Sequence, residues 1–285
     1  MSADTVGEIN GMNPEVIEDV FAVRHNAGAW QRTDHTFVRI IGADAASWLH
    51  SQTTNDVTGL ESGQGHANAI LDRQGRLQGH FTLHRWEDEY WMLVERAQWP
   101  RVHEHLDAHL FIENVQMEEA GEDLEQVVIQ GPRTLRYLAA LLDKEGVEAS
   151  HLLPSAGWGC HPLELLGFEV LAFRVSLTGE DGYVFVVERG QGGALLDALI
   201  AGGGNAPVPR ILDEAIEVLR IEAGIPKFGV DMDATNPIPE TTLERTAVSY
   251  EKGCYIGQEV VARLRTYGSV KQALVGLVFE ASDVG

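Results

Sequence analysis

The chain has 285 residues, of which 44% are hydrophobic, and this composition is that of a folded protein rather than a disordered one. Its length suggests two lobes, since single cores stop growing at about 250–300 residues. The net charge of −22 argues against general binding to nucleic acids or anionic membranes, and two cysteines are too few for a disulfide framework.

The spacing of apolar residues predicts a mixture of helices and strands. Asn13 and Pro14 are typical of the start of a helix. We expect helices at 14–24, 45–52, 99–110, 132–142, 191–200 and 211–223. We expect strands at 37–41, 67–71, 77–84, 90–94, 111–117, 126–130, 169–175 and 182–187. Strands that follow one another through short turns pair antiparallel, so this grouping predicts an α+β protein with mainly antiparallel sheets covered by helices.

The C-terminal end of the chain has a different organisation. Residues 271–279 are typical of the first strand of a further domain, and the chain stops six residues later at Gly285. A lone strand cannot close a sheet. We therefore expect two intertwined α+β lobes over residues 1–268 and the incomplete start of a C-terminal domain over residues 269–285.

The sequence also bears on the surroundings of the protein. No apolar run reaches about 20 residues, the length that spans a bilayer, and residues 1–13 lack the basic and apolar regions of a secretory signal. We expect a cytoplasmic protein, with no membrane or nucleic-acid partner, and the strong charge favours a monomer. Few of its basic residues are lysines, and such an acidic surface is typical of proteins in molar salt, where carboxylates repel each other weakly. We therefore expect a salt-adapted source, while an ordinary acidic cytosolic protein is the alternative.

Residues 241–275 depart from this acidic average. They hold five basic residues against three acidic ones, which gives a local charge of about +2. A cationic stretch in an acidic chain suggests that an anionic ligand docks there. Arginines that are solvated or paired within the protein would give the same composition.

Four segments resemble, in this order, the aminomethyltransferase (glycine-cleavage T-protein) family of folate-binding proteins. They are residues 37–57, the turn Thr178-Gly179-Glu180-Asp181-Gly182-Tyr183, residues 219–240, and Lys252-Gly253-Cys254-Tyr255-Ile256-Gly257-Gln258-Glu259. The last segment is typical of the YgfZ branch. The resemblance implies the folate-binding fold of this family, whose C-terminal β-barrel would be truncated here. It also implies tetrahydrofolate or a one-carbon derivative as cofactor, and a role in iron–sulfur cluster assembly or repair with client or assembly proteins as partners.

The cofactor-binding residues follow from the second and third segments. A pterin presents an amino group beside a ring N–H, and a carboxylate can accept both hydrogen bonds. By resemblance, Glu180 is this carboxylate, although Gly-Glu-Asp-Gly is also a common hairpin turn. Arg220 can pair with a carboxylate or stack on a ring of folate, and an ion pair with Glu180 or Glu222 is the alternative. The resemblance also places Asp231 and Glu240 at the pocket.

The segment 252–259 contains the candidate catalytic residues. Lys252 lies two residues before Cys254, and a nearby ammonium favours the thiolate. Cys254 can then be a redox or cluster contact, a nucleophile, or a small buried side chain. Tyr255 can stack on the pterin, and Gln258 can orient Lys252 or close the pocket. Arg263 can provide a cation for the glutamate tail of folate.

One segment separates an enzyme from an accessory protein. Aminomethyltransferases carry a catalytic aspartate in the segment aligned with residues 75–80, where this chain has Gln78 and Gly79, and His80 is the titratable residue within reach. Glutamine cannot ionise, so it cannot stabilise a cationic centre as a carboxylate does. We expect an accessory folate-binding protein without a metal site. A folate-dependent aminomethyltransferase is the alternative, and a folate-free interaction module is the third reading.

Overall fold

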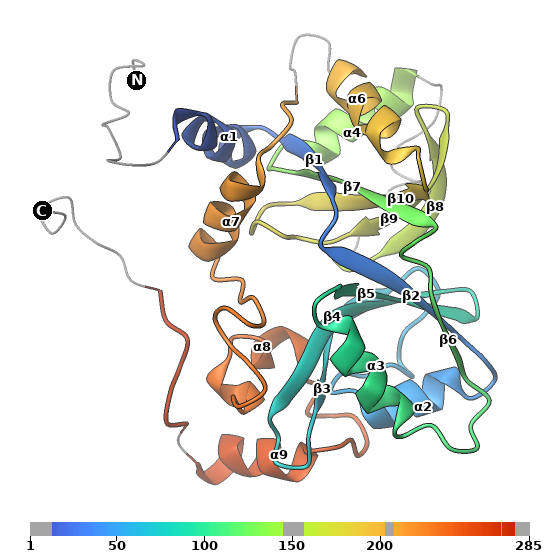
Figure 1. Cartoon of the computed structure of the whole chain (residues 1–285), viewed down its shortest axis with the longest axis vertical. Coiled ribbons are helices and arrows are strands. Elements are labelled where there is room, and N and C mark those ends of the chain that lie inside the picture. The colour runs from blue at the N-terminus through green and yellow to red at the C-terminus, as the bar shows by residue number, and fades with distance from the viewer. Residues whose placement is uncertain (1–12, 145–156, 203–207, 269, 277–285) are drawn as a thin grey trace, which may run out of the picture.

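Two five-stranded antiparallel sheets form the centre of the protein (Figure 1). The computed structural model describes residues 13–144, 157–202, 208–268 and 270–276. The first sheet has the order β1-β7-β10-β9-β8, with β1 Gly28–Arg32, β7 Leu124–Gln130, β8 Cys160–Leu165, β9 Phe168–Arg174 and β10 Gly182–Glu188. The second has the order β3-β4-β5-β2-β6, with β2 His35–Ile41, β3 Gly65–Leu71, β4 Leu77–Trp86, β5 Glu89–Glu95 and β6 Gln116–Glu119. The predicted α+β class with mainly antiparallel sheets is confirmed.

Helices cover the outer face of each sheet. The described helices are α1 Pro14–His25, α2 Ala45–Gln52, α3 Trp99–Asp107, α4 Thr134–Lys144, α6 Gly192–Gly202, α7 Asp213–Glu222, α8 Glu244–Ala247 and α9 Gln258–Tyr267, with a 3-10 turn η2 at Ile238–Glu240. Leucines of α4 and α6 form one core with the first sheet, and Trp48 and Leu49 of α2 form another with the second sheet and α3. The inner faces of both sheets share a third core with α7.

Strand β10 shows why both faces of the sheets are buried. Successive side chains of a strand point to opposite faces. Tyr183 and Phe185 accordingly join the core under α4 and α6, while Val184 and Val186 join the core between the sheets. A strand that is apolar at every position therefore belongs to a sheet covered on both sides.

Most predicted elements are present, and α2 has the predicted bounds. Strands β1 and β8 were not predicted. The pattern of β8 is interrupted by Pro162, which is tolerated because β8 is an edge strand. The short C-terminal helices α8 and α9 were also missed.

Two predicted strands are wrong over most of their length. Of residues 111–117, only the last two belong to a strand, because the Glu113 carboxylate accepts the backbone N–H groups of Phe111 and Ile112 and holds a local turn. Of residues 271–279, the described part 271–276 forms no strand, and the rest lies outside the described residues. The backbone N–H of Leu274 donates to the carbonyl of Glu240. Among the helices within the described ranges, none combines the length and apolarity that crossing a membrane requires.

Candidate functional site

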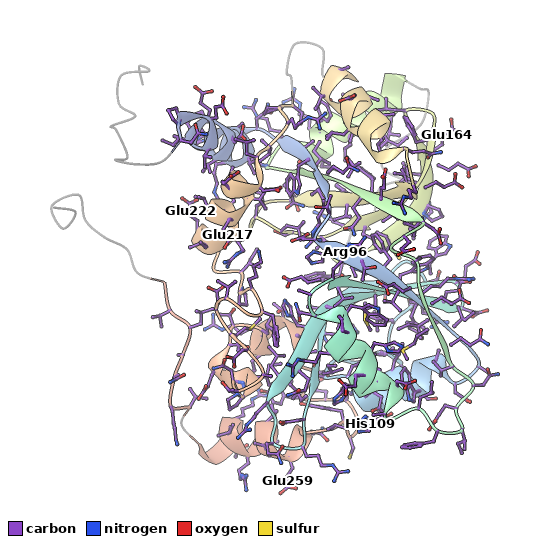
Figure 2. The ribbon with its side chains drawn as sticks, viewed as in Figure 1. Arg96, His109, Glu164, Glu217, Glu222 and Glu259 are labelled. Carbon is purple, nitrogen blue, oxygen red and sulfur yellow. The ribbon has the colours of Figure 1, made fainter. Side chains whose placement is uncertain are left out.

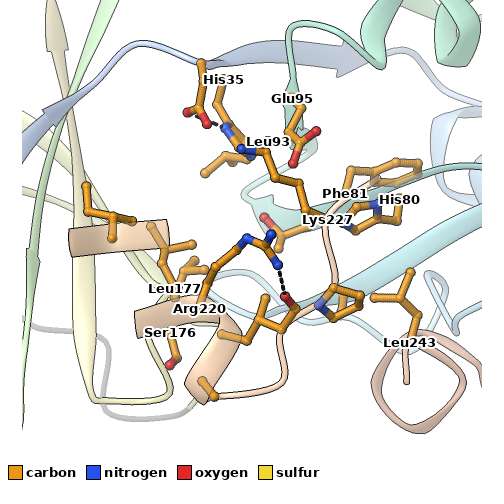
Figure 3. A pocket seen from close by; sticks show the side chains of 18 of the residues that line it. His35, His80, Phe81, Leu93, Glu95, Ser176, Leu177, Arg220, Lys227 and Leu243 are labelled. Atoms are coloured by element: carbon orange, nitrogen blue, oxygen red, sulfur yellow. Dashed lines mark hydrogen bonds and ion pairs between the residues drawn. The ribbon is translucent and has the colours of Figure 1, made fainter. Parts of the chain in front are cut away.

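A cavity of about 860 Å³ lies between the two sheets (Figure 3). Trp30 and Val175 line it from the side of the first sheet, and Phe81 and Leu93 from the second. Helix α7 and the segments 223–227 and 242–246 contribute further parts of the wall. The cavity thus combines flat apolar surfaces with charged residues from α7 and its neighbouring loops.

Arg220 lies in the wall of this cavity, where it is largely buried. Its guanidinium donates to Asp231 Oδ2 at 2.6 Å, to the carbonyl oxygen of Ile225 at 3.0 Å and to the Glu217 carboxylate. These partners, with Glu217 in first place, raise the pKa of Arg220 above its ordinary value. The structure therefore joins Arg220 to Asp231 in an ion pair that the sequence did not predict. The ion pair expected as the alternative, between Arg220 and Glu180 or Glu222, is wrong, because both of those carboxylates are paired with Arg24.

A polar chain of three residues forms the edge of the cavity near β2. Arg32 donates to Asp34 and to Nε2 of His35, whose Nδ1 lies 2.8 Å from Asp34. An imidazole nitrogen that accepts from a guanidinium carries no proton, so His35 is neutral with its proton on Nδ1. Burial and the neighbouring Arg32 lower the pKa of His35 to about 3. Both ring nitrogens of His35 are therefore engaged by neighbouring residues of the cavity wall.

Glu180 does not line the cavity, although its neighbour Gly179 does. Its carboxylate is paired with Arg24 at 3.1 Å, and Arg24 also donates to the carbonyl oxygens of Thr178 and Leu219. Figure 2 shows Glu222, a further partner of Arg24, projecting from α7 beside Glu217. Glu180, the residue predicted to bind the pterin, therefore forms an ion pair with Arg24 in this structure.

Lys252 caps the C-terminal end of helix α2. Its ammonium donates to the carbonyl oxygens of His50, Thr53 and Asn55, the last two at 2.6 and 3.1 Å. The last carbonyls of a helix have no partner within the helix, and a cation there also complements the helix dipole. Burial lowers the pKa of Lys252 to about 8. The expected pairing of this lysine with the thiol of Cys254 is thus replaced by three backbone carbonyls.

Apart from Tyr255, the remaining residues of this segment are exposed or half-buried, and none of them lines the cavity. Cys254 and Arg263 are exposed, and Gln258 donates weakly to the carbonyl of Gly253. Tyr255 is buried in a small core, with the Lys252 ammonium 5.1 Å from its ring centre. The pterin-stacking role proposed for Tyr255 would therefore need a rearrangement of this core.

Gly257 fixes the position of α9. Its φ of +83° is one that residues with a side chain rarely adopt. A Cβ atom here would lie 2.5 Å from the carbonyl oxygen of Asp72. Glycine therefore lets α9 begin directly against the turn between β3 and β4. Glu259, in the first turn of α9, lies at the opposite end of the molecule from α6 (Figure 2).

Glu240 lies at a second, smaller cleft of about 110 Å³, which Asp231 also lines. Asn236 donates to the Glu240 carboxylate at 3.3 Å.

Gln78 does not line the large cavity and instead contacts Arg101 and the carbonyl of Arg76. Glu95 and Lys227 line the cavity, although the sequence did not identify them as residues of the site. The two-residue period of β5 would have placed Glu95 on the face of Leu93.

Comparison with known proteins gives a consistent result. The model of the family described as the GCVT N-terminal domain matches residues 7–252. An aminomethyltransferase of Prosthecochloris aestuarii is 28% identical over 247 residues, which cover 86% of this chain and 66% of that protein. One of Pelodictyon phaeoclathratiforme is 28% identical over 264 residues, covering 92% and 70%. The chain thus spans about two thirds of the length of these curated relatives.

Solved structures show the same fold. The glycine cleavage system aminomethyltransferase T from Bartonella henselae matches with a TM-score of 0.74 at 21% sequence identity. The match covers 88% of this chain and 66% of that one. At this identity the likeness shows a shared fold.

Proposed function

This chain belongs to the GCVT N-terminal domain family, and we propose that it binds tetrahydrofolate or a one-carbon derivative in the cavity between its sheets. The observation that carries the proposal is the size and lining of that cavity. Its volume of about 860 Å³ lies within the range of small-molecule sites, roughly 300–1,000 Å³. Trp30, Phe81 and Leu93 offer apolar surface for a pterin and a benzoyl ring, and Lys227 and Arg245 offer cations for the glutamate carboxylates.

We further propose an accessory role in iron–sulfur cluster assembly or repair, in a cytoplasmic setting. Cys254 supports it, because this thiol is exposed and within reach of a partner protein or a cluster. The second candidate is a folate-dependent aminomethyltransferase. It is favoured by the names of the relatives and by Glu95, a carboxylate that lines the cavity. A carboxylate in the cavity can stabilise a developing positive charge, which Gln78 cannot.

Binding of 5-formyltetrahydrofolate is expected to quench tryptophan fluorescence, because Trp30 and Trp158 line the cavity. Calorimetric titration gives the dissociation constant. Leu177→Trp is the matched variant, since Leu177 is half-buried at the cavity wall and a larger side chain would fill the space. It should weaken binding at least about tenfold while the midpoint of thermal unfolding stays unchanged. Wild-type protein that binds no ligand at millimolar concentration contradicts the proposal.

Replacement of Cys254 by alanine is expected to lower the activity of iron–sulfur enzymes in cells that depend on this protein. The exposed position means that folding and folate affinity should be retained, so the loss would report on the thiol. The measurement is the activity of such an enzyme in cells with either form of the chain. Full activity with the alanine variant removes the thiol from the mechanism. Glycine-dependent turnover by the purified chain would favour the enzyme instead.

A further inference from the structure

A histidine from the first quarter of the chain lies beside the segment that contains Cys254. The Lys252 ammonium donates to the main-chain carbonyl of His50, a residue 202 positions away in the sequence. The imidazole Nε2 of His50 lies 3.6 Å from the point at which a Cβ atom on Gly253 would stand. Cys254 is the next residue, and its thiol is exposed. Because consecutive Cα atoms lie about 3.8 Å apart, this nitrogen and the thiol share one small area of the surface, where one water molecule can bridge them.

Asp56 and Thr58 hold the imidazole of His50 in place. Nδ1 of His50 lies 3.2 Å from Asp56 Oδ1 and 3.2 Å from the Thr58 hydroxyl, which donates to the same carboxylate oxygen at 3.0 Å. A carboxylate only accepts hydrogen bonds, so this arrangement favours the tautomer with its proton on Nδ1. The backbone N–H of Thr58 also points to Nδ1, but at 3.4 Å it is the longer and weaker contact.

The second ring nitrogen of His50 is therefore free to accept a proton. Among the residues that the structure describes, none forms a hydrogen bond with Nε2. Burial lowers the pKa of His50, and the Lys252 ammonium acts in the same direction, while Asp56 opposes them. The imidazole is accordingly neutral at pH 7, with the lone pair of Nε2 beside the segment of the thiol.

These residues have the arrangement of an activated nucleophile. Such a nucleophile needs a base close to it, and the base is oriented by a third group. Here the thiol belongs to Cys254, the base is His50 and the orienting carboxylate is Asp56. All three lie outside the lining of the large cavity. The other thiol of the chain, Cys160, is buried, and burial raises its pKa to about 12.

We propose that Cys254, His50 and Asp56 form a thiol–disulfide exchange site that reacts with a low-molecular-mass disulfide. His50 Nε2 takes the thiol proton of Cys254, and the resulting thiolate attacks one sulfur of the disulfide. An S–S bond to Cys254 forms, the original S–S bond breaks, and the leaving thiolate takes the proton from His50. Cys254 is oxidised to a mixed disulfide, and the released thiol is the reduced product. Asp56 is a positioning residue that acts through His50.

This inference goes beyond the proposed folate binding and does not depend on it. It specifies the chemistry of Cys254 in the proposed accessory role. The two can fail separately, because the exchange reaction is measured without folate. Protein that binds no 5-formyltetrahydrofolate contradicts the proposed function and leaves the exchange site standing, and a thiol that reacts independently of His50 leaves folate binding standing.

The base is tested by the rate at which the full chain reacts with dithiobis(nitrobenzoate), a small disulfide that releases a coloured thiolate. At pH 7, His50→Gln should react at least about tenfold more slowly than the wild type, because a carboxamide cannot take the proton. At about pH 9.5, hydroxide ionises the thiol in both proteins, and their rates should agree within about twofold. The ratio of the two rates within one protein cancels any change in the exposure of the thiol.

Two further substitutions separate the base from a residue that only supports the fold. Asp56→Asn should give a rate at pH 7 between those of the wild type and His50→Gln, because it weakens the hold on the imidazole without removing it. His103→Gln, at an exposed histidine of α3, should react like the wild type. If His50→Gln has the same ratio of rates as the wild type, His50 is not the base and the inference is overturned.

The site of reaction is tested with Cys254→Ala and with oxidised glutathione. The alanine variant should release no coloured thiolate while it is folded, because Cys160 is buried. Mass spectrometry of the wild type should show one glutathione on Cys254, added at least about tenfold faster at pH 7 than in His50→Gln. Colour release by folded Cys254→Ala, or glutathione found on Cys160, would assign the reaction to the wrong thiol and overturn the inference.

Discussion

Replacing Lys252 by methionine is expected to lower the free energy of unfolding by about 3–5 kcal/mol. Methionine keeps the length of the side chain but leaves the carbonyl oxygens of His50, Thr53 and Asn55 without their donor. The site is buried, so water cannot freely replace the ammonium. Urea denaturation of the two proteins, followed by circular dichroism, gives the difference.

The effect should be specific to the position of Lys252. Lys271→Met removes the same charge from an exposed residue and should change stability by less than about 0.5 kcal/mol. The helix α2 and the segment 246–249 should lose protection from hydrogen exchange first, because Thr54 and Asn55 join them through hydrogen bonds to Ala247 and Thr246. A loss below about 1 kcal/mol for Lys252→Met would mean that water replaces the cap.

The sequence predicted an α+β fold with mainly antiparallel sheets because its strongest signals are local. Strand β10 is apolar at nearly every position and could be recognised as buried on both faces. Strand β8 could not, because Pro162 and Glu164 interrupt its pattern and only its place at the sheet edge tolerates them. The turn at Phe111 depends on the Glu113 side chain, which no apolar period reports.

The sequence could identify residues of the candidate site, but it could not identify most of the contacts that these residues make. Arg220 was identified from its segment and does line the cavity. The partner of Lys252 was not predictable, because the carbonyls that it caps lie about 200 positions away in the chain. The roles proposed for Glu180 and Tyr255 depend on whether each side chain faces the cavity. The ion pair with Arg24 determines the orientation of Glu180, and packing in the small core determines that of Tyr255.

Three histidines, of which His84 is buried and His35 and His80 are half-buried, contribute to how the fold responds to acid. His84 is fully buried, with its Nδ1 3.1 Å from the carbonyl of Trp158, and burial lowers its pKa to about 3. The pKa values of His35 and His80 are lowered to about 3 and about 4. In the unfolded chain a histidine has a pKa near 6.5, so between these values the unfolded state binds the proton and the folded state does not. Stability is therefore complete above about pH 6.5 and falls as the pH falls toward 4.

The expected loss at pH 5 is about 2 kcal/mol for each of these histidines, or about 6 kcal/mol together, which is a large part of the 5–15 kcal/mol typical of a folded protein. Chemical denaturation at a series of pH values between 8 and 5 measures it. His84→Gln should remove about a third of the slope, because a carboxamide can keep a hydrogen bond but does not titrate. His103→Gln, at an exposed histidine, is the matched control. If the free energy of unfolding does not change down to pH 5, these imidazoles take up protons within the fold. Burial would then not be what keeps His80 neutral in the cavity.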